Sequence, residues 1–186
     1  MTKRLARSVL DRLVADSAAV TRRHTANRAA GFDGFIAADP LRAQEERVRL
    51  RERASSFVEL GCGSGLITII ADLLGYDACG IESRAELVAA AEELAARHGA
   101  APRFVLGSFM PSDADLGELL DADFHLTDDS LPSAWTEVRL TDFDIVYAFP
   151  WPGEEVVFFD LMRRHGRAGQ TLLTFDAGEG FVEHAQ

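Results

Sequence analysis

A chain of 186 residues with 47% hydrophobic and 26% charged residues is long enough to bury the core of one globular domain. It holds no apolar run near the ~20 residues of a membrane span and no apolar segment of a secretory signal, so we expect a cytoplasmic protein without membrane contact. The net charge of −11 divides into +5 for residues 1–56 (12 Lys and Arg against 7 Asp and Glu) and −16 for residues 57–186 (7 against 23), and the acidic larger part disfavours nucleic acid as a partner.

Residues 1–56 are predicted to form a helical N-terminal segment of the same domain. Apolar residues recur at helical spacing between Thr2 and Arg23, opposite a basic face. Pro40 opens a second predicted helix, rich in Arg and Glu, that runs to about Ala54.

The segment 57–66, F-V-E-L-G-C-G-S-G-L, combines an apolar strand, a glycine turn and the start of a helix. Gly61, Gly63 and Gly65 occupy every second position after Glu59. Without a Cβ, a glycine turn accepts positive φ angles and lets a ligand approach the backbone, while the positive end of the helix dipole faces that ligand. This pattern predicts a nucleotide-type binding edge.

Strands and helices are predicted to alternate after this turn, in the manner of an α/β protein. The predicted strands are 57–60, 78–82, 103–106, 143–148 and 170–175. An acidic insertion at about 111–142 separates the third strand from the fourth. Its aspartates lack the ordered ligand pattern of a calcium loop, so we expect a solvated acidic surface and no metal site. The two cysteines, Cys62 and Cys79, are predicted to be packing residues.

The G-x-G-x-G spacing after Glu59 resembles motif I of the class I S-adenosylmethionine-dependent methyltransferases, and differs from the G-x-G-x-x-G of dinucleotide-binding proteins. Glu82 ends the second predicted strand about 20 residues past Gly61, as in that family. The resemblance covers residues 57–175. It implies a Rossmann-like, doubly wound, mostly parallel sheet of order 3-2-1-4-5 with helices on both faces, and S-adenosyl-L-methionine as the cofactor.

The resemblance also implies roles for individual residues in cofactor binding. The backbone of the three glycines would approach the methionine part of the cofactor, and Glu59 would orient the loop. Glu82 would accept hydrogen bonds from the ribose hydroxyls. Ser108 and Phe109 would flank the adenine, although Ser108 stands where the family often has an acid.

The end of the fourth strand is the expected acceptor side, because ligands of open α/β sheets bind beyond the carboxyl ends of the strands. The candidate acceptor-pocket residues are Tyr147, Phe149, Pro150 and Trp151, and Tyr147 is the nearest base by position. Prolines on both sides of Trp151 hold its indole in few orientations, although Trp151 could instead cap the core. The leading Asn or Asp of the amino-methylating motif is absent here, which disfavours adenine and glutamine amides as acceptors.

Only residues 176–186 follow the fifth predicted strand, too few for the helix and hairpin that complete the family's sheet. The fold is therefore expected to be shortened at this edge. The fifth strand would be an exposed edge, covered by the insertion, the N-terminal helices or a second subunit in a homodimer.

The predicted function is methyl transfer from S-adenosylmethionine to an N or O acceptor, either a small molecule or a protein side chain. Two alternatives from other classes remain open. One is a non-catalytic protein that binds the cofactor or serves in assembly. The other is an NAD-dependent oxidoreductase, which the glycine spacing disfavours.

Overall fold

The computed structural model describes residues 4–25, 40–112, 131–150, 153–176 and 180–185. The predictions for Trp151 and for most of the acidic insertion lie outside these residues.

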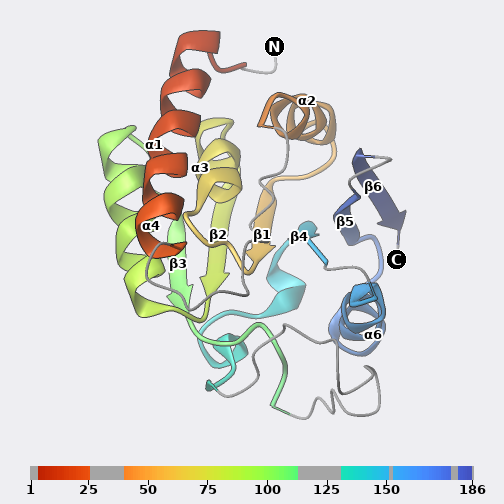
Figure 1. The fold of residues 1–186 in the computed structure, drawn as a ribbon. Coiled ribbons are helices and arrows are strands. Elements are labelled where there is room, and N and C mark those ends of the chain that lie inside the picture. Colours follow the sequence, from red (N-terminus) through yellow and green to blue (C-terminus); the bar gives the residue numbers. More distant parts are fainter. Residues whose placement is uncertain (1–3, 26–39, 113–130, 151–152, 177–179, 186) are drawn as a thin grey trace.

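One six-stranded sheet with the order β3-β2-β1-β4-β5-β6 forms the centre of the molecule (Figure 1). The strands are β1 (Ser56–Leu60), β2 (Asp77–Glu82), β3 (Arg103–Leu106), β4 (Ile145–Ala148), β5 (Thr171–Asp176) and β6 (Gly180–Ala185). The pairs within β1–β5 are parallel, as predicted. The order of these five strands also confirms the prediction. Their carboxyl ends therefore meet at one edge of the sheet, where α/β folds bind ligands.

The sixth strand corrects the prediction of an exposed β5 edge. β6 runs antiparallel to β5, with Phe181 opposite Phe175 and Ala185 opposite Thr171. An antiparallel strand needs only a short turn and no crossover helix, so the few residues after β5 are enough to form it. The outer edge now belongs to β6. The homodimer was predicted through an exposed β5 edge, which β6 covers, so the homodimer stays a prediction.

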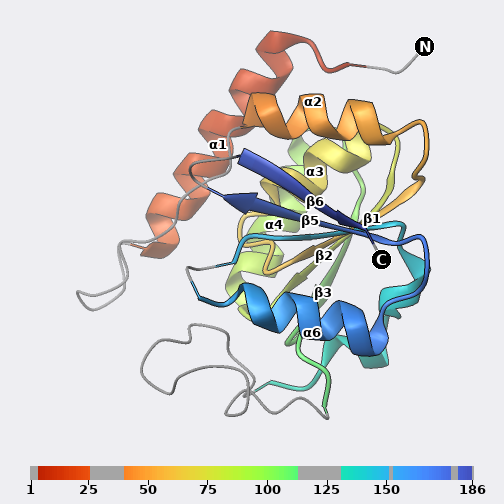
Figure 2. The same cartoon turned by 90° about the vertical axis from the view of Figure 1, so that its right-hand side faces the viewer.

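Helices cover both faces of the sheet (Figure 2). They are α1 (Arg7–Thr25), α2 (Pro40–Leu50), α3 (Leu66–Leu73), α4 (Ala85–Arg97) and α6 (Glu155–His165). Leu13 of α1, Ile69 of α3 and Leu94 of α4 share one buried cluster, while Phe158 and Met162 of α6 belong to a cluster on the opposite face. The predicted N-terminal helices are thus part of the domain's core.

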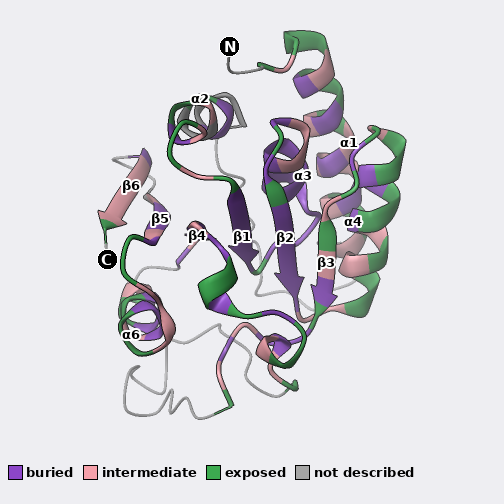
Figure 3. Cartoon of the chain, turned by 180° about the vertical axis from the view of Figure 1, so that it is seen from behind, coloured by how far each residue is buried: buried purple, intermediate pink, exposed green. Residues whose placement is uncertain are grey.

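The central strand β1 alternates between these two clusters. Phe57 faces the cluster of α1, α3 and α4, and Val58 and Leu60 face that of α6. Every residue of β1 is buried (Figure 3). This burial on both faces explains why residues 57–60 are apolar except for Glu59.

Asp144 joins the amino ends of β1 and β4. Its carboxylate accepts hydrogen bonds from the backbone N–H of Ser55 at 2.7 Å and of Ser56 at 3.1 Å, and from the guanidinium of Arg167 at 2.7 Å. Burial raises the pKa of Asp144, but the hydrogen bonds from Ser55 and Arg167 outweigh it and lower the pKa from 3.8 to about 2.

We expect Asp144→Asn to lower the free energy of unfolding by about 2 kcal/mol at pH 7, because an amide cannot accept all these hydrogen bonds. The folded pKa lies below the unfolded one, so the carboxylate stabilises the fold above pH 3.8, and this contribution is lost as the pH falls through about 2. Urea unfolding of both proteins across this range provides the measurement. A difference that stays constant down to the lowest pH would contradict the assignment.

Candidate functional site

The glycine turn lies at the carboxyl end of β1, next to β2. Gly61, Gly63 and Gly65 have φ angles of 75°, 54° and 74°, which only glycine adopts readily. The N–H groups of Gly61 and Cys62 both donate to the carbonyl of Ile81 at 2.9 Å. The turn is therefore fixed to the end of β2.

Glu82, the last residue of β2, connects this turn to the start of α4. Its Oε2 accepts a hydrogen bond from the Gly63 N–H at 2.8 Å, and its Oε1 accepts one from the Arg84 N–H at 3.0 Å. The side chain is largely buried. A carboxylate is thus held between a glycine turn and a helix at the ligand-binding edge of the sheet.

Glu59 contacts the first turn of α3. One carboxylate oxygen accepts hydrogen bonds from the backbone N–H of Thr68 at 2.9 Å and from its hydroxyl. The first N–H groups of a helix have no partner within the helix, so this contact caps α3 from the neighbouring strand. Its effect is to hold α3 against β1.

Three further backbone donors lie at the turn and the start of α3. Within the described parts of the chain, the N–H groups of Ser64, Leu66 and Ile67 make no hydrogen bond. The Ser64 hydroxyl instead shares a buried hydrogen bond of 2.8 Å with the hydroxyl of Ser17 in α1. No signal in the sequence predicts this link between the N-terminal helix and the turn.

Both cysteines are free and buried, Cys62 in the turn and Cys79 inside β2, as expected for packing residues. Burial, followed by the negative charges of Glu59 and Glu82, raises the pKa of Cys62 well above its usual value. Burial also raises the pKa of Cys79 to about 11. Burial therefore favours the protonated thiol at both positions, which fits packing residues.

The residues after β3 differ in their orientation. Ser108 is buried, and its hydroxyl accepts a hydrogen bond from the Met110 N–H at 3.1 Å. Phe109 is half-buried and stacks on Phe158 of α6, with 5.5 Å between the ring centroids. A Cβ built on Gly61 would lie 3.8 Å from the Phe109 ring. Phe109 therefore borders the glycine turn, whereas the Ser108 side chain is used inside the fold.

Comparison with solved structures identifies the fold. An O-methyltransferase from Bacillus cereus in complex with SAH (S-adenosylhomocysteine) superposes with a TM-score of 0.57 at 15% identity, over 91% of this chain and 66% of that one. The chain has the class I methyltransferase fold. A putative O-methyltransferase from Klebsiella pneumoniae matches with a TM-score of 0.54 at 18% identity, over the same shares of the two chains. An RNA methyltransferase from Salinibacter ruber, also in complex with SAH, matches with a TM-score of 0.54 at 16% identity, over 80% of this chain and 90% of its own.

At the level of sequence, neither the protein-family models nor the curated proteins give a match. The chain spans about two thirds of the length of the two O-methyltransferases.

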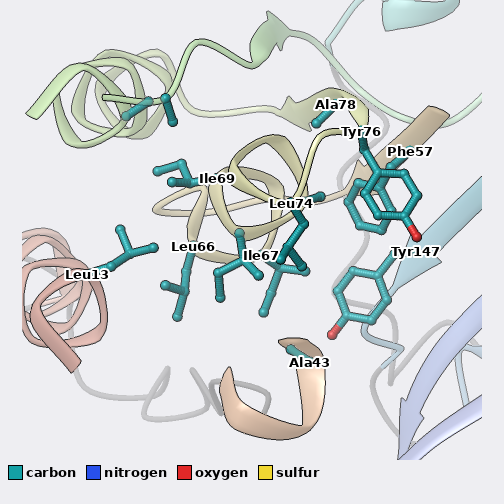
Figure 4. Close-up of a cluster of buried hydrophobic side chains, with 14 of the residues drawn as sticks. Leu13, Ala43, Phe57, Leu66, Ile67, Ile69, Leu74, Tyr76, Ala78 and Tyr147 are labelled. Carbon is teal, nitrogen blue, oxygen red and sulfur yellow. The ribbon is translucent and has the colours of Figure 1, made fainter. Parts of the chain in front are cut away.

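Tyr147 occupies a different place from the one predicted for it in this methyltransferase fold. Its side chain is buried and lies beside Phe57, with ring centroids 6.2 Å apart and planes at 22° (Figure 4). The alternation along β4 places it on the same face as Ile145, in the cluster with α3. The structure therefore corrects the assignment of Tyr147 to the acceptor pocket: it is a core residue.

An aromatic pair lies where β4 and β5 end, and it joins Phe149, a predicted acceptor-pocket residue, to Phe175, which was not predicted. Phe149 and Phe175 are half-buried and stack with 5.5 Å between their centroids. Phe175 also makes an edge contact with Phe181 of β6. The two rings thus lie at the carboxyl end of the parallel strands, and the contact of Phe175 with Phe181 depends on the pairing of β6.

The described residues contain no group of three or more His, Cys, Asp and Glu side chains that could hold a metal ion. The aspartates 121, 123, 128 and 129 lie outside this part of the chain. None of the described helices combines the length and the apolar character that a membrane crossing requires.

Proposed function

We propose that this protein is a methyltransferase that uses S-adenosyl-L-methionine to methylate an N or O acceptor, either a small molecule or a protein side chain. The observation that carries the proposal is the position of Glu82. Its carboxylate binds the N–H of Gly63 inside a turn of three positive-φ glycines, at the edge where this fold binds ligands. A ribose with two hydroxyl donors fits such a carboxylate.

The remaining residues of the turn suit the rest of the cofactor. The N–H groups of Leu66 and Ile67, at the positive end of α3, favour the carboxylate of the methionine part. The Phe109 ring offers an apolar wall to the adenine. When bound, the cofactor supplies a methyl group on a sulfonium that is already activated. The chain's own contribution is then to hold donor and acceptor in line and to exclude water.

An oxygen acceptor is the better supported of the two. Two of the compared proteins are named O-methyltransferases, and each superposes over 91% of this chain. RNA is disfavoured, although one neighbour is an RNA methyltransferase, because residues 57–186 carry a net charge of −16, from 7 basic and 23 acidic residues.

The test is calorimetric titration of the purified protein with S-adenosylhomocysteine, with NAD titrated in parallel. We expect micromolar or tighter binding of S-adenosylhomocysteine and none of NAD. Binding of neither ligand would contradict the proposal. If S-adenosylhomocysteine binds but labelled S-adenosylmethionine is not turned over with O, N or protein acceptors, the alternative of a non-catalytic binding protein would be favoured.

A further inference from the structure

The turn after β3 is held by the end of the segment that connects β3 to β4. The Ser108 N–H donates to the carbonyl of Pro132 at 3.0 Å, and the Ala134 N–H donates to the carbonyl of Ser108 at 2.8 Å. Ser108 and Ser133 thus form a short parallel bridge next to the sheet. We refer to residues 132–135 as the clamp.

Gly107 allows the close approach of the clamp to this turn. A Cβ built on Gly107 would lie 2.9 Å from the Pro132 carbonyl oxygen and 3.1 Å from the Ala134 nitrogen. Both of these atoms belong to the backbone, so they could not move aside by a side-chain rotation. Any larger residue at this position would push the clamp away from the turn.

Trp135 extends the clamp to Phe109. It lies in the 3-10 helix η1 (Ala134–Thr136), and its indole Nε1–H donates to the carbonyl of Phe109 at 2.7 Å. Both residues pack against the buried cluster on the α6 side of the sheet. Phe109 is therefore held at two points: Trp135 fixes its backbone and Phe158 supports its ring.

We propose that Trp135 is a positioning residue of the cofactor site, which sets the place of Phe109 against the adenine of the bound cofactor. The inference rests on the proposed function, because it requires the adenine to lie beside Phe109. It adds that the connection between β3 and β4 takes part in cofactor binding through the clamp.

The test is Trp135→Phe, which keeps an aromatic ring and removes the N–H donor. We expect binding of S-adenosylhomocysteine and of adenosine to weaken by the same factor, about 3- to 10-fold, as for the loss of one buried hydrogen bond. Binding of S-ribosylhomocysteine, which has no adenine, should be unchanged. If Trp135 had a merely structural role, the binding of all three ligands would weaken together, and that result would overturn the proposal.

Thr136→Ala is the matched control. Thr136 is exposed on the same 3-10 helix, and its hydroxyl donates only to the nearby Ser133 carbonyl at 3.1 Å, so its loss should alter none of the affinities.

If Trp135→Phe does not fold, Gly107→Ala perturbs the same contact from the opposite side and should show the same adenine-specific loss. Unchanged affinity in folded Trp135→Phe would overturn the inference and leave the proposed function standing. Absence of S-adenosylhomocysteine binding to the unaltered protein would instead contradict the proposed function itself.

Discussion

Replacing Glu82 with alanine is expected to weaken S-adenosylhomocysteine binding by about 100-fold. The carboxylate is the proposed acceptor for both ribose hydroxyls, and two hydrogen bonds to a charged group contribute together about 3 kcal/mol, which corresponds to that factor. The loss also frees the Gly63 N–H that the carboxylate now binds, so the turn itself becomes less well positioned. Calorimetric titration provides the affinity, and a thermal melt without ligand shows that the variant is folded.

Glu86→Gln is the control for the change of charge. Glu86 lies in the first turn of α4, is exposed and pairs with the guanidinium of Arg84, so its neutralisation removes a nearby negative charge without removing a contact to the glycine turn. We expect its affinity to stay within about 2-fold of the unaltered protein. An unchanged affinity in folded Glu82→Ala would show that the ribose does not lie at Glu82.

Gly65→Ala is expected to destabilise the fold by about 2–5 kcal/mol. Gly65 has a φ of 74°, a conformation that costs an alanine about 1–2 kcal/mol. Its Cβ would also lie 2.8 Å from the Phe104 ring and 3.0 Å from the Ala91 Cβ, and overpacking of this kind costs about 1–3 kcal/mol. Urea unfolding followed by circular dichroism provides the free energy.

Gly99→Ala separates the two contributions. Gly99 has a similar φ of 69°, but a Cβ there would meet no atom within 4 Å. We expect this variant to lose only the conformational part, about 1–2 kcal/mol. Equal losses at Gly65 and Gly99 would mean that Phe104 moves aside and that the contact between α3, α4 and β3 is not tightly packed.

The central part of the fold could be predicted from the sequence because its signals are local. A strand that ends at a glycine turn and is followed by a helix reads directly from residues 57–74, and the order of β1–β5 follows from the family resemblance. β6 was missed because a single antiparallel strand leaves no helix and no long apolar run. The position of Tyr147 follows from strand alternation: Ile145 and Tyr147 share a face of β4, and Phe57 of β1 lies on that same face.

The predicted site was incomplete for a different reason. Glycines and carboxylates at fixed spacing predict the turn. The structure places Gly61, Gly63, Gly65 and Glu82 together. Trp135 could not be identified because it contacts the backbone carbonyl of Phe109. Every residue has a backbone carbonyl, so the sequence cannot indicate which of them a side chain will contact. The same holds for the pair of Ser17 and Ser64, which are joined across 47 residues by two hydroxyls.

The place of β1 at the centre of the sheet affects how the chain reaches its fold. β1 pairs with β2 on one side and with β4 on the other, and the contact between Ser55 and Asp144 spans 89 residues. Such non-local pairing slows folding, because the entropy of closing the loop is lost before the contacts form. The same entropy depends only weakly on length, since each doubling of a flexible loop costs about 0.6 kcal/mol. A long connection between β3 and β4 therefore costs this protein folding speed more than stability.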